Sequence, residues 1–218
     1  MYTFNKIKYK KGNRLLPGEK QIYIDGNHED FATVKAKYEW LANNTNYPNT
    51  KYDHRNIKEL YDSIKLFVKE KEITSVLDVG CGRGGFCNIL TDYCNTVHGL
   101  DFAIKPDKEF KEKNINFIKS DAHTIPLPDN SVELITSFDF LEHIHPDYLE
   151  KTIKEMFRVG FKYMIHKIAS GPSKSHFDKV GQLHLIQEHK KSFWINKVFK
   201  PHVKEIKSLG HGTFLMKI

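Results

Sequence analysis

The sequence predicts an α/β protein built on a mostly parallel sheet with helices on both faces. Three observations lead to this fold class. Short apolar segments alternate with helical patterns from residue 75 onward, a glycine-rich turn follows the first apolar segment, and acidic residues stand at or near the ends of three of these segments. Strands that alternate with helices pair in parallel through right-handed crossovers. Because the chain has 218 residues, we expect one domain with additions.

The residues before the first strand are expected to form an extension and two helices. Residues 1–25 carry alternating apolar residues and a turn signal, which suggests a loose arm or a short hairpin. Helical spacing predicts a helix over residues 31–41, and a polar, turn-rich break follows at 43–50. Apolar residues between Ile57 and Val68 predict a second helix with one apolar face.

A glycine-rich turn after the first strand is the most informative part of the sequence. Ser75 to Val79 reads as a buried strand, and a helical pattern follows from Phe86 to Tyr93. Between them lie the glycines at positions 80, 82, 84 and 85. Glycine lets the backbone turn sharply and lets a ligand approach it, and the next helix offers unpaired N–H groups. Asp78 would repel a pyrophosphate but suits a ligand with an ammonium group.

Two further strands end at acidic residues. The strand Thr96 to Leu100 is followed by Asp101 and Phe102, and the strand Ile115 to Lys119 is followed by Asp121 and Ala122. In an open α/β sheet the ligand binds beyond the carboxyl ends of the strands, so these residues are candidates for one site. Alternatively, Asp101 is a helix cap and the glycine loop a tight turn without a ligand.

The remaining elements complete the predicted sheet. A turn at 127–131 leads into the fourth strand, and four strand–helix units are expected in this part of the chain, with Pro146 opening a helix through Arg158. The later elements are a fifth strand over 161–168, a long loop over 169–187, a helix over 192–199, and closing strands over 203–206 and 213–218.

The glycines at 80, 82 and 84 with Asp78 resemble motif I of the class I S-adenosylmethionine (SAM)-dependent methyltransferases. The run L-P-D-N-S-V-E-L-I from 127, followed by L-E-H-I from 141, is similar to the group that includes quinone-biosynthesis and sugar methyltransferases. The resemblance covers roughly residues 55–167. It implies a Rossmann-like, seven-stranded, mostly parallel sheet of order 3-2-1-4-5-7-6. Residues 1–52 would form an N-terminal arm and lid, and residues 53–218 the methyltransferase domain.

The resemblance also implies the cofactor, SAM, with S-adenosylhomocysteine as product. Asp78 and the glycines would hold the amino-acid end of SAM, Asp101 the ribose hydroxyls, and the residues after the third strand the adenine. The predicted cofactor-binding residues are Asp78, Gly80, Gly82, Gly84, Asp101, Phe102, Asp121, Ala122 and Phe138. No metal site is predicted.

Two histidines are candidates for a general base. His143 follows the fourth strand, where the family often presents a residue near the transferred methyl, and a structural role is the alternative. His184 lies ten residues before Trp194. This part of the sequence resembles a segment that lines the acceptor pocket in many sugar methyltransferases. Trp194 itself is expected to pack on the core. Tyr38, Trp40 and Tyr52 are candidate pocket aromatics in the lid.

Composition limits the possible partners. Residues 73–150 carry 6 basic and 13 acidic groups, whereas residues 151–218 carry 14 basic and 4 acidic groups. A basic face favours phosphorylated or nucleic-acid partners, but the chain has only four arginines, the residue that phosphate readers often use. No apolar run approaches the ~20 residues that span a bilayer. The cysteines at 81, 87 and 94 lack metal-ligand spacing and read as reduced hydrophobes of a cytoplasmic protein.

The acceptor is predicted to be a small molecule, sugar-like or phosphorylated, with a sugar or nucleotide-sugar hydroxyl as first choice. The fourth strand ends in Ser137-Phe138-Asp139-Phe140 and not in an Asn/Asp-Pro-Pro-aromatic sequence, which disfavours transfer to an exocyclic nitrogen. Asp139, Lys167 and Glu205 fall near positions of the ribose methyltransferase Lys-Asp-Lys-Glu set. Nucleic-acid methylation therefore remains an alternative, as does a SAM-binding protein without catalysis.

Overall fold

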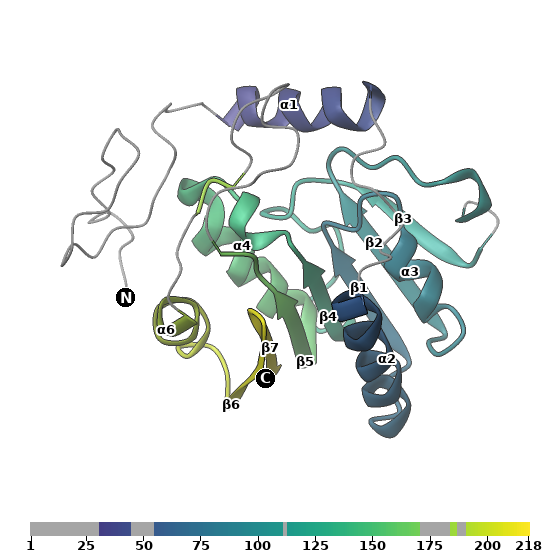
Figure 1. Cartoon of the computed structure of the whole chain (residues 1–218), viewed down its shortest axis with the longest axis vertical. Helices are drawn as coiled ribbons and strands as arrows, with labels where there is room; N and C mark the ends of the chain where they lie inside the picture. Colours follow the sequence, from purple (N-terminus) through teal and green to yellow (C-terminus); the bar gives the residue numbers. More distant parts are fainter. Residues whose placement is uncertain (1–30, 45–54, 111–112, 171–183, 187–190) are drawn as a thin grey trace.

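One mixed sheet of seven strands, in the order β3-β2-β1-β4-β5-β7-β6, forms the centre of the computed structural model (Figure 1). The structure describes residues 31–44, 55–110, 113–170, 184–186 and 191–218. The strands are β1 Ser75–Val79, β2 Thr96–Asp101, β3 Ile115–Lys119, β4 Val132–Phe138, β5 Gly160–Lys167, β6 Glu205–Gly210 and β7 Thr213–Lys217. Only β7 pairs antiparallel with both of its neighbours. The predicted fold class and strand order are confirmed.

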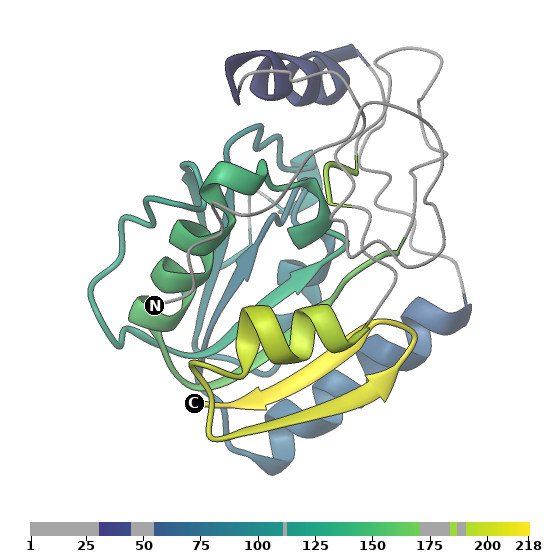
Figure 2. The same cartoon turned by 90° about the vertical axis from the view of Figure 1, so that its left-hand side faces the viewer.

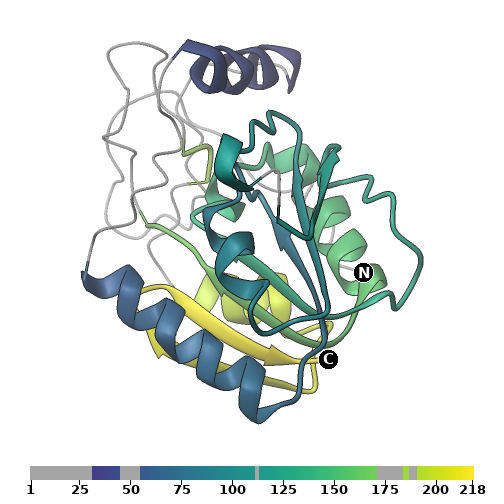
Figure 3. The ribbon, with the colours of Figure 1, turned by 90° about the vertical axis from the view of Figure 1, so that its right-hand side faces the viewer.

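Helices cover both faces of this sheet. They are α1 Phe31–Asn44, α2 Arg55–Glu70, α3 Gly85–Leu90, α4 Pro146–Val159 and α6 Lys191–Phe193, with the π-helical turn η4 Trp194–Phe199 continuing α6 and the 3₁₀ turns η2 Lys108–Phe110 and η3 Leu141–His143. Figure 2 shows α4, α6 and η4 on one face, and Figure 3 shows α2 and α3 on the other. No helix in the described ranges is long and apolar enough to cross a bilayer.

Two apolar cores fill the space between these layers. One core lies between the sheet and α4 with η4, and includes Met156, Phe199 and Phe214, each at most 1% exposed. The other lies between the sheet and α2 with α3, and includes Ile64, Val68 and Leu90. A central strand such as β1 contributes to both, which explains why its last four residues are all buried.

Local sequence signals explain where the main helices begin and end. Pro146 occupies the first turn of α4, where its missing N–H has no partner to lose. His145 caps the same helix by accepting a bond from the Asp147 N–H at 3.3 Å. The apolar face of α2 is predicted correctly and contributes Tyr61, Ile64 and Val68 to the core.

Three predicted elements differ from the structure. The helix predicted through Tyr93 ends at Leu90, and the Cys94 N–H closes a turn back to the Leu90 carbonyl at 2.9 Å. Residues 120–131 contain turns and no helix, so the expectation of four strand–helix units is wrong. Pro126 and Pro128 explain this loop, because proline cannot extend a helix. Finally, β6 begins at Glu205 and not at residue 203.

The helix α1 lies across the carboxyl end of the sheet (Figure 1). It contains the predicted helix 31–41 and extends to Asn44. The Lys105 ammonium donates to the Ala42 carbonyl at 2.9 Å and so ties the C-terminal part of α1 to the segment after β2. The predicted arm at 1–25 lies outside the described residues. The proposed lid therefore corresponds, in the described part, to α1.

Candidate cofactor and acceptor site

The glycine loop after β1 adopts a conformation that other residues tolerate poorly. Gly80, Gly82 and Gly84 have φ values of +80°, +54° and +88°. A Cβ at Gly80 would stand 2.2 Å from the Phe140 ring, and a Cβ at Gly84 would stand 2.6 Å from the Phe117 ring. Backbone angles and contacts therefore both require glycine at these two positions. The Gly80 N–H donates to the Leu100 carbonyl at 2.7 Å, which fixes the loop against β2.

Asp78 lies beneath this loop rather than on its surface. The side chain is 4% exposed, and one carboxylate oxygen accepts a hydrogen bond from the Thr136 hydroxyl at 2.8 Å. Burial raises the pKa of Asp78 to about 7, the Thr136 hydrogen bond opposes this shift, and the charge of Asp101 adds to it. Thr136 was not predicted as part of the site. It faces Asp78 because the two residues are register partners in the parallel pair β1–β4.

Asp101 connects the end of β2 to the glycine loop. Its Oδ2 accepts from the Gly82 N–H at 3.0 Å and its Oδ1 from the Ala103 N–H at 2.8 Å. Each carboxylate oxygen has a second acceptor position, so both can still accept from a ligand hydroxyl. Burial raises the pKa of Asp101, and the two backbone hydrogen bonds oppose this shift. The side chain is held in one orientation before any ligand arrives.

A pocket beyond the carboxyl ends of β2, β3 and β4 brings five predicted residues together. Its lining includes Asp101, Phe102, Asp121, Ala122 and His143. The same lining includes Phe140, whose ring packs against the backbone of the glycine loop. The loop and the pocket are thus adjoining parts of one site.

Phe138 lies away from this pocket. Its ring contacts the Tyr61 and Phe86 rings edge-on, with centroid distances of 5.5 and 4.6 Å. These rings belong to the core on the α2 and α3 side of the sheet. The predicted cofactor-binding residue Phe138 therefore packs among aromatic side chains of the core and does not line the pocket.

The helix α1 contacts the pocket at two points. The Lys35 ammonium lies 3.1 Å from both carboxylate oxygens of Asp121 and 5.6 Å from the Phe102 ring centre. One turn later, the Tyr38 hydroxyl lies 2.5 Å from Nδ1 of His143. Of the three candidate lid aromatics, Tyr38 therefore reaches the site, Trp40 is 45% exposed, and Tyr52 lies outside the described residues.

His143 and His184 meet although 40 residues separate them in the sequence. Their ring centres are 4.7 Å apart with the rings nearly perpendicular. The N–H groups of Leu185 and Ile186 both donate to the Glu142 carbonyl, at 2.8 and 2.9 Å, and so hold the short segment 184–186 against η3.

Glu142 lies between the two histidines and the end of β5. Its side chain is fully buried, and its Oε1 accepts from the Ala169 N–H at 2.9 Å. The other oxygen, Oε2, is buried without a hydrogen-bond partner. Burial raises the pKa of Glu142 to about 8, and the nearby charge of Asp139 adds to this shift. The L-E-H segment contains this glutamate, but only its place in the fold shows that it is buried.

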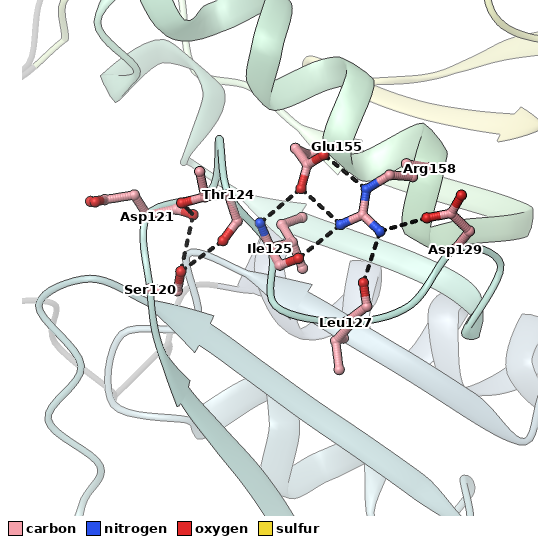
Figure 4. A network of polar contacts seen from close by, with 8 residues as sticks. All are labelled: Ser120, Asp121, Thr124, Ile125, Leu127, Asp129, Glu155 and Arg158. Carbon is pink, nitrogen blue, oxygen red and sulfur yellow. Dashed lines mark hydrogen bonds and ion pairs between the residues drawn. The ribbon is translucent and has the colours of Figure 1, made fainter.

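The loop that carries Asp121 and Ala122 is fixed to α4 by Arg158 (Figure 4). The guanidinium donates to the Leu127 and Ile125 carbonyls at 2.8 Å each, and pairs with Asp129 and Glu155. Glu155 also accepts from the Ile125 N–H at 2.9 Å. Although the loop lacks a helix, its path is defined, because every guanidinium nitrogen has a partner on the loop or on α4. The sequence gives no indication of this role for Arg158.

A second pocket of about 380 Å³ lies at the carboxyl end of β5. Its lining includes Lys167, Ala169, Lys191, Trp194 and His211. Trp194 is 3% exposed and belongs to the core, which confirms the packing role predicted for it. The Ala169 N–H donates to Glu142, so this cationic pocket borders the Glu142–His143–His184 group.

The suggested Lys-Asp-Lys-Glu arrangement is wrong in its last member. Lys167 does form an ion pair with Asp139. Glu205 of β6, however, pairs in register with Lys217 at the end of β7. On β5, the partner of Lys217 is Tyr163, whereas Lys167 pairs with Thr213 at the other end of β7. Glu205 is therefore about four residues, or roughly 13 Å, from Lys167 along the strands. Cys81, Cys87 and Cys94 are all buried, which agrees with the packing role expected for them.

Fold, loop and pocket together define an α/β protein with one candidate ligand site at the carboxyl ends of β2, β3 and β4. Residues 77–160 match the family model described as a methyltransferase domain. This part of the chain is therefore similar to a methyltransferase domain, and the fold is one that a SAM-dependent methyltransferase of known structure shares.

Two curated relatives and one solved structure that are similar to this chain are named as methyltransferases. The chain is 36% identical over 110 residues to a sterol 24-C-methyltransferase of Pneumocystis carinii, covering 46% of the chain and 28% of the relative. It is 32% identical over 113 residues to a demethylmenaquinone methyltransferase of Listeria welshimeri, with 47% of each covered. It is also similar to the structure of a SAM-dependent methyltransferase from Aquifex aeolicus, with a TM-score of 0.51, 23% identity, and 77% and 94% of the two chains covered. In both curated relatives the matched segment covers less than half of the relative's length.

Proposed function

We propose that this chain transfers the methyl group of SAM to a small-molecule acceptor, for which a sugar or nucleotide-sugar hydroxyl is the first candidate. The observation that carries the proposal is the pairing of Asp101 with the glycine loop. The carboxylate is anchored by the Gly82 and Ala103 N–H groups at the edge of the pocket. A carboxylate fixed in this way suits the two neighbouring hydroxyls of a ribose, because ligand binding does not have to order the side chain first.

Each part of SAM has a complementary group in this proposal. The backbone of Gly80, Gly82 and Gly84 approaches the amino-acid end of SAM, and Asp78 below the loop attracts its ammonium group. Asp121 accepts from the adenine amino group, and Phe102 and Ala122 flank the ring. Lys35 forms an ion pair with Asp121, the group that would accept from the adenine. Cofactor binding is therefore expected to shift or replace this ion pair.

The acceptor is proposed to bind between His143 and the second pocket. His143 lines the cofactor pocket, and His184 lies beside it. A methyl acceptor must be held in line with the methyl carbon, and a hydroxyl acceptor also benefits from a general base near pH 7. Lys191 in the second pocket would favour a phosphorylated or otherwise anionic acceptor, whereas the charge of Lys167 is already paired with Asp139. The printed names of the curated relatives, which concern a sterol and a quinone precursor, also favour a small molecule.

Nucleic-acid methylation is the second candidate, and it rests on the basic charge of residues 151–218. A protein that binds SAM without turnover is the third. One experiment separates all three: SAM binding is measured by calorimetry, and an acceptor screen then detects S-adenosylhomocysteine. The proposal expects turnover with small molecules. Turnover with RNA or DNA alone, or binding without turnover against any acceptor pool, would replace it with one of the alternatives.

A further inference from the structure

We propose that Glu142, His143 and His184 form a binding site for a divalent transition-metal ion, with Zn²⁺ as the ion that fits best. One ligand atom from each of these residues lies within 4.8 Å of the others. Two imidazoles and one carboxylate are a donor set that Zn²⁺ uses in catalytic sites, where a fourth position stays open. The sequence did not predict this site, because its members come from two distant segments.

The buried carboxylate supports a ligand at this point. The Glu142 side chain has no exposed surface, and its Oε2 has no hydrogen-bond partner. Buried polar atoms in native proteins are nearly always satisfied, so an orphaned oxygen needs an explanation. A metal ion between Oε2 and the two imidazoles supplies the missing partner.

The histidines are already positioned for this role. Two backbone hydrogen bonds to the Glu142 carbonyl hold the segment that carries His184, and Ile186 is 1% exposed beneath it. Nδ1 of His143 lies 2.5 Å from the Tyr38 hydroxyl, and this contact orients the ring. Metal-binding histidines usually have the other ring nitrogen hydrogen-bonded in this way, which sets the orientation of the ring.

The distances require a small contraction. Ligands bound tetrahedrally at about 2.1 Å lie roughly 3.4 Å from one another. The three donor atoms must therefore move together by about 1 Å, which side-chain rotation can supply. The ion would border the proposed acceptor side of the pocket, and its open position would face an acceptor oxygen. Only this last point rests on the proposed methyl transfer. With the ion bound, the two histidines are ligands and do not act as the general base.

The test uses the tag-free, full-length chain after chelator treatment. Titration calorimetry with Zn²⁺ should show one ion bound per chain, and Co²⁺ should give the visible absorption of a low-coordinate site. His184→Ala should weaken Zn²⁺ binding at least about 100-fold, and Tyr38→Phe about 10-fold, because it removes a bond that orients a ligand. His202→Ala is the matched control, since His202 is exposed and stacks on Phe157 outside the site.

Equal Zn²⁺ affinity in the wild type and in His184→Ala would overturn the proposal, as would an absorption spectrum identical to that of hydrated Co²⁺. Glu142→Gln tests the third ligand, and the melting temperature of this variant shows whether it folds. If Glu142→Gln does not fold, His184→Ala carries the test, because His184 is partly exposed and its replacement disturbs the core less. SAM titration on the same samples keeps the two proposals apart. SAM binding without Zn²⁺ binding refutes the metal site alone, and the reverse result refutes the proposed function alone.

Discussion

Replacing Gly80 with alanine tests the geometry of the cofactor loop. Alanine must adopt φ near +80°, and its Cβ would stand 2.2 Å from the Phe140 ring. The left-handed backbone costs about 1–2 kcal/mol for a residue with a Cβ. Overpacking against a partly buried ring costs about 1–3 kcal/mol more. We therefore expect Gly80→Ala to lower the free energy of unfolding by about 2–5 kcal/mol, which is the sum of these two effects.

Gly210→Ala provides a matched control, because Gly210 also has positive φ, +92°, but nothing lies within 4 Å of its added Cβ. This variant should lose only about 1–2 kcal/mol, the backbone part. Urea unfolding measures both values, and calorimetry measures SAM affinity, which should fall in Gly80→Ala alone. Combining Gly80→Ala with Phe140→Ala should cost less than the sum of the two single changes, since the clash is then absent. Equal losses in the two glycine variants would refute the steric argument.

Three further predictions concern the charged groups of the site. Asp101→Ala should weaken SAM binding at least about 10-fold by calorimetry, since hydrogen bonds to a charged group are each worth about 1.5–3 kcal/mol; unchanged affinity would remove the ribose assignment. The pKa of Asp78 is raised from 3.8 to about 7, so the folded state keeps a proton that the unfolded chain has released. The free energy of unfolding should therefore fall as pH rises from about 4 to 7, and urea unfolding at each pH should show a shallower slope for Asp78→Asn than for the wild type. Arg158→Ala should lower the free energy of unfolding by about 1–3 kcal/mol and weaken SAM binding, whereas Lys154→Ala, which breaks an exposed pair on the same helix, should change neither measurably.

The strands were predicted well because their signals are local. Ser75 to Val79 and Ile115 to Lys119 are short apolar segments bounded by polar residues or glycine, and the structure places β1 and β3 within those bounds. Errors occurred where tertiary contacts decide. The loop over 120–131 takes its path from Arg158, a residue more than 25 positions away, and no periodicity in the loop itself reports that contact.

The sequence predicted that residues at the ends of β2 and β3 lie together, but it did not predict the long-range contacts around them. Asp101 and Asp121 stand at strand ends, which parallel pairing brings to one edge of the sheet. Thr136 reaches Asp78 through the register of β1 and β4, and Lys35 reaches Asp121 across 86 positions. Neither register nor long-range pairing is encoded in local spacing. For the same reason the buried Glu142 received no role from the sequence, although its neighbour His143 did.

The two contacts of α1 have a consequence for the order of binding. Lys35 contacts Asp121, on the proposed adenine side, and Tyr38, three residues later, contacts His143, on the proposed acceptor side. Residues three apart share one face of a helix, so a single displacement of α1 changes both contacts at once. Occupancy at one end should then alter affinity at the other, and by linkage the effect must be reciprocal. Donor and acceptor are accordingly expected to bind with thermodynamic coupling and not as independent ligands.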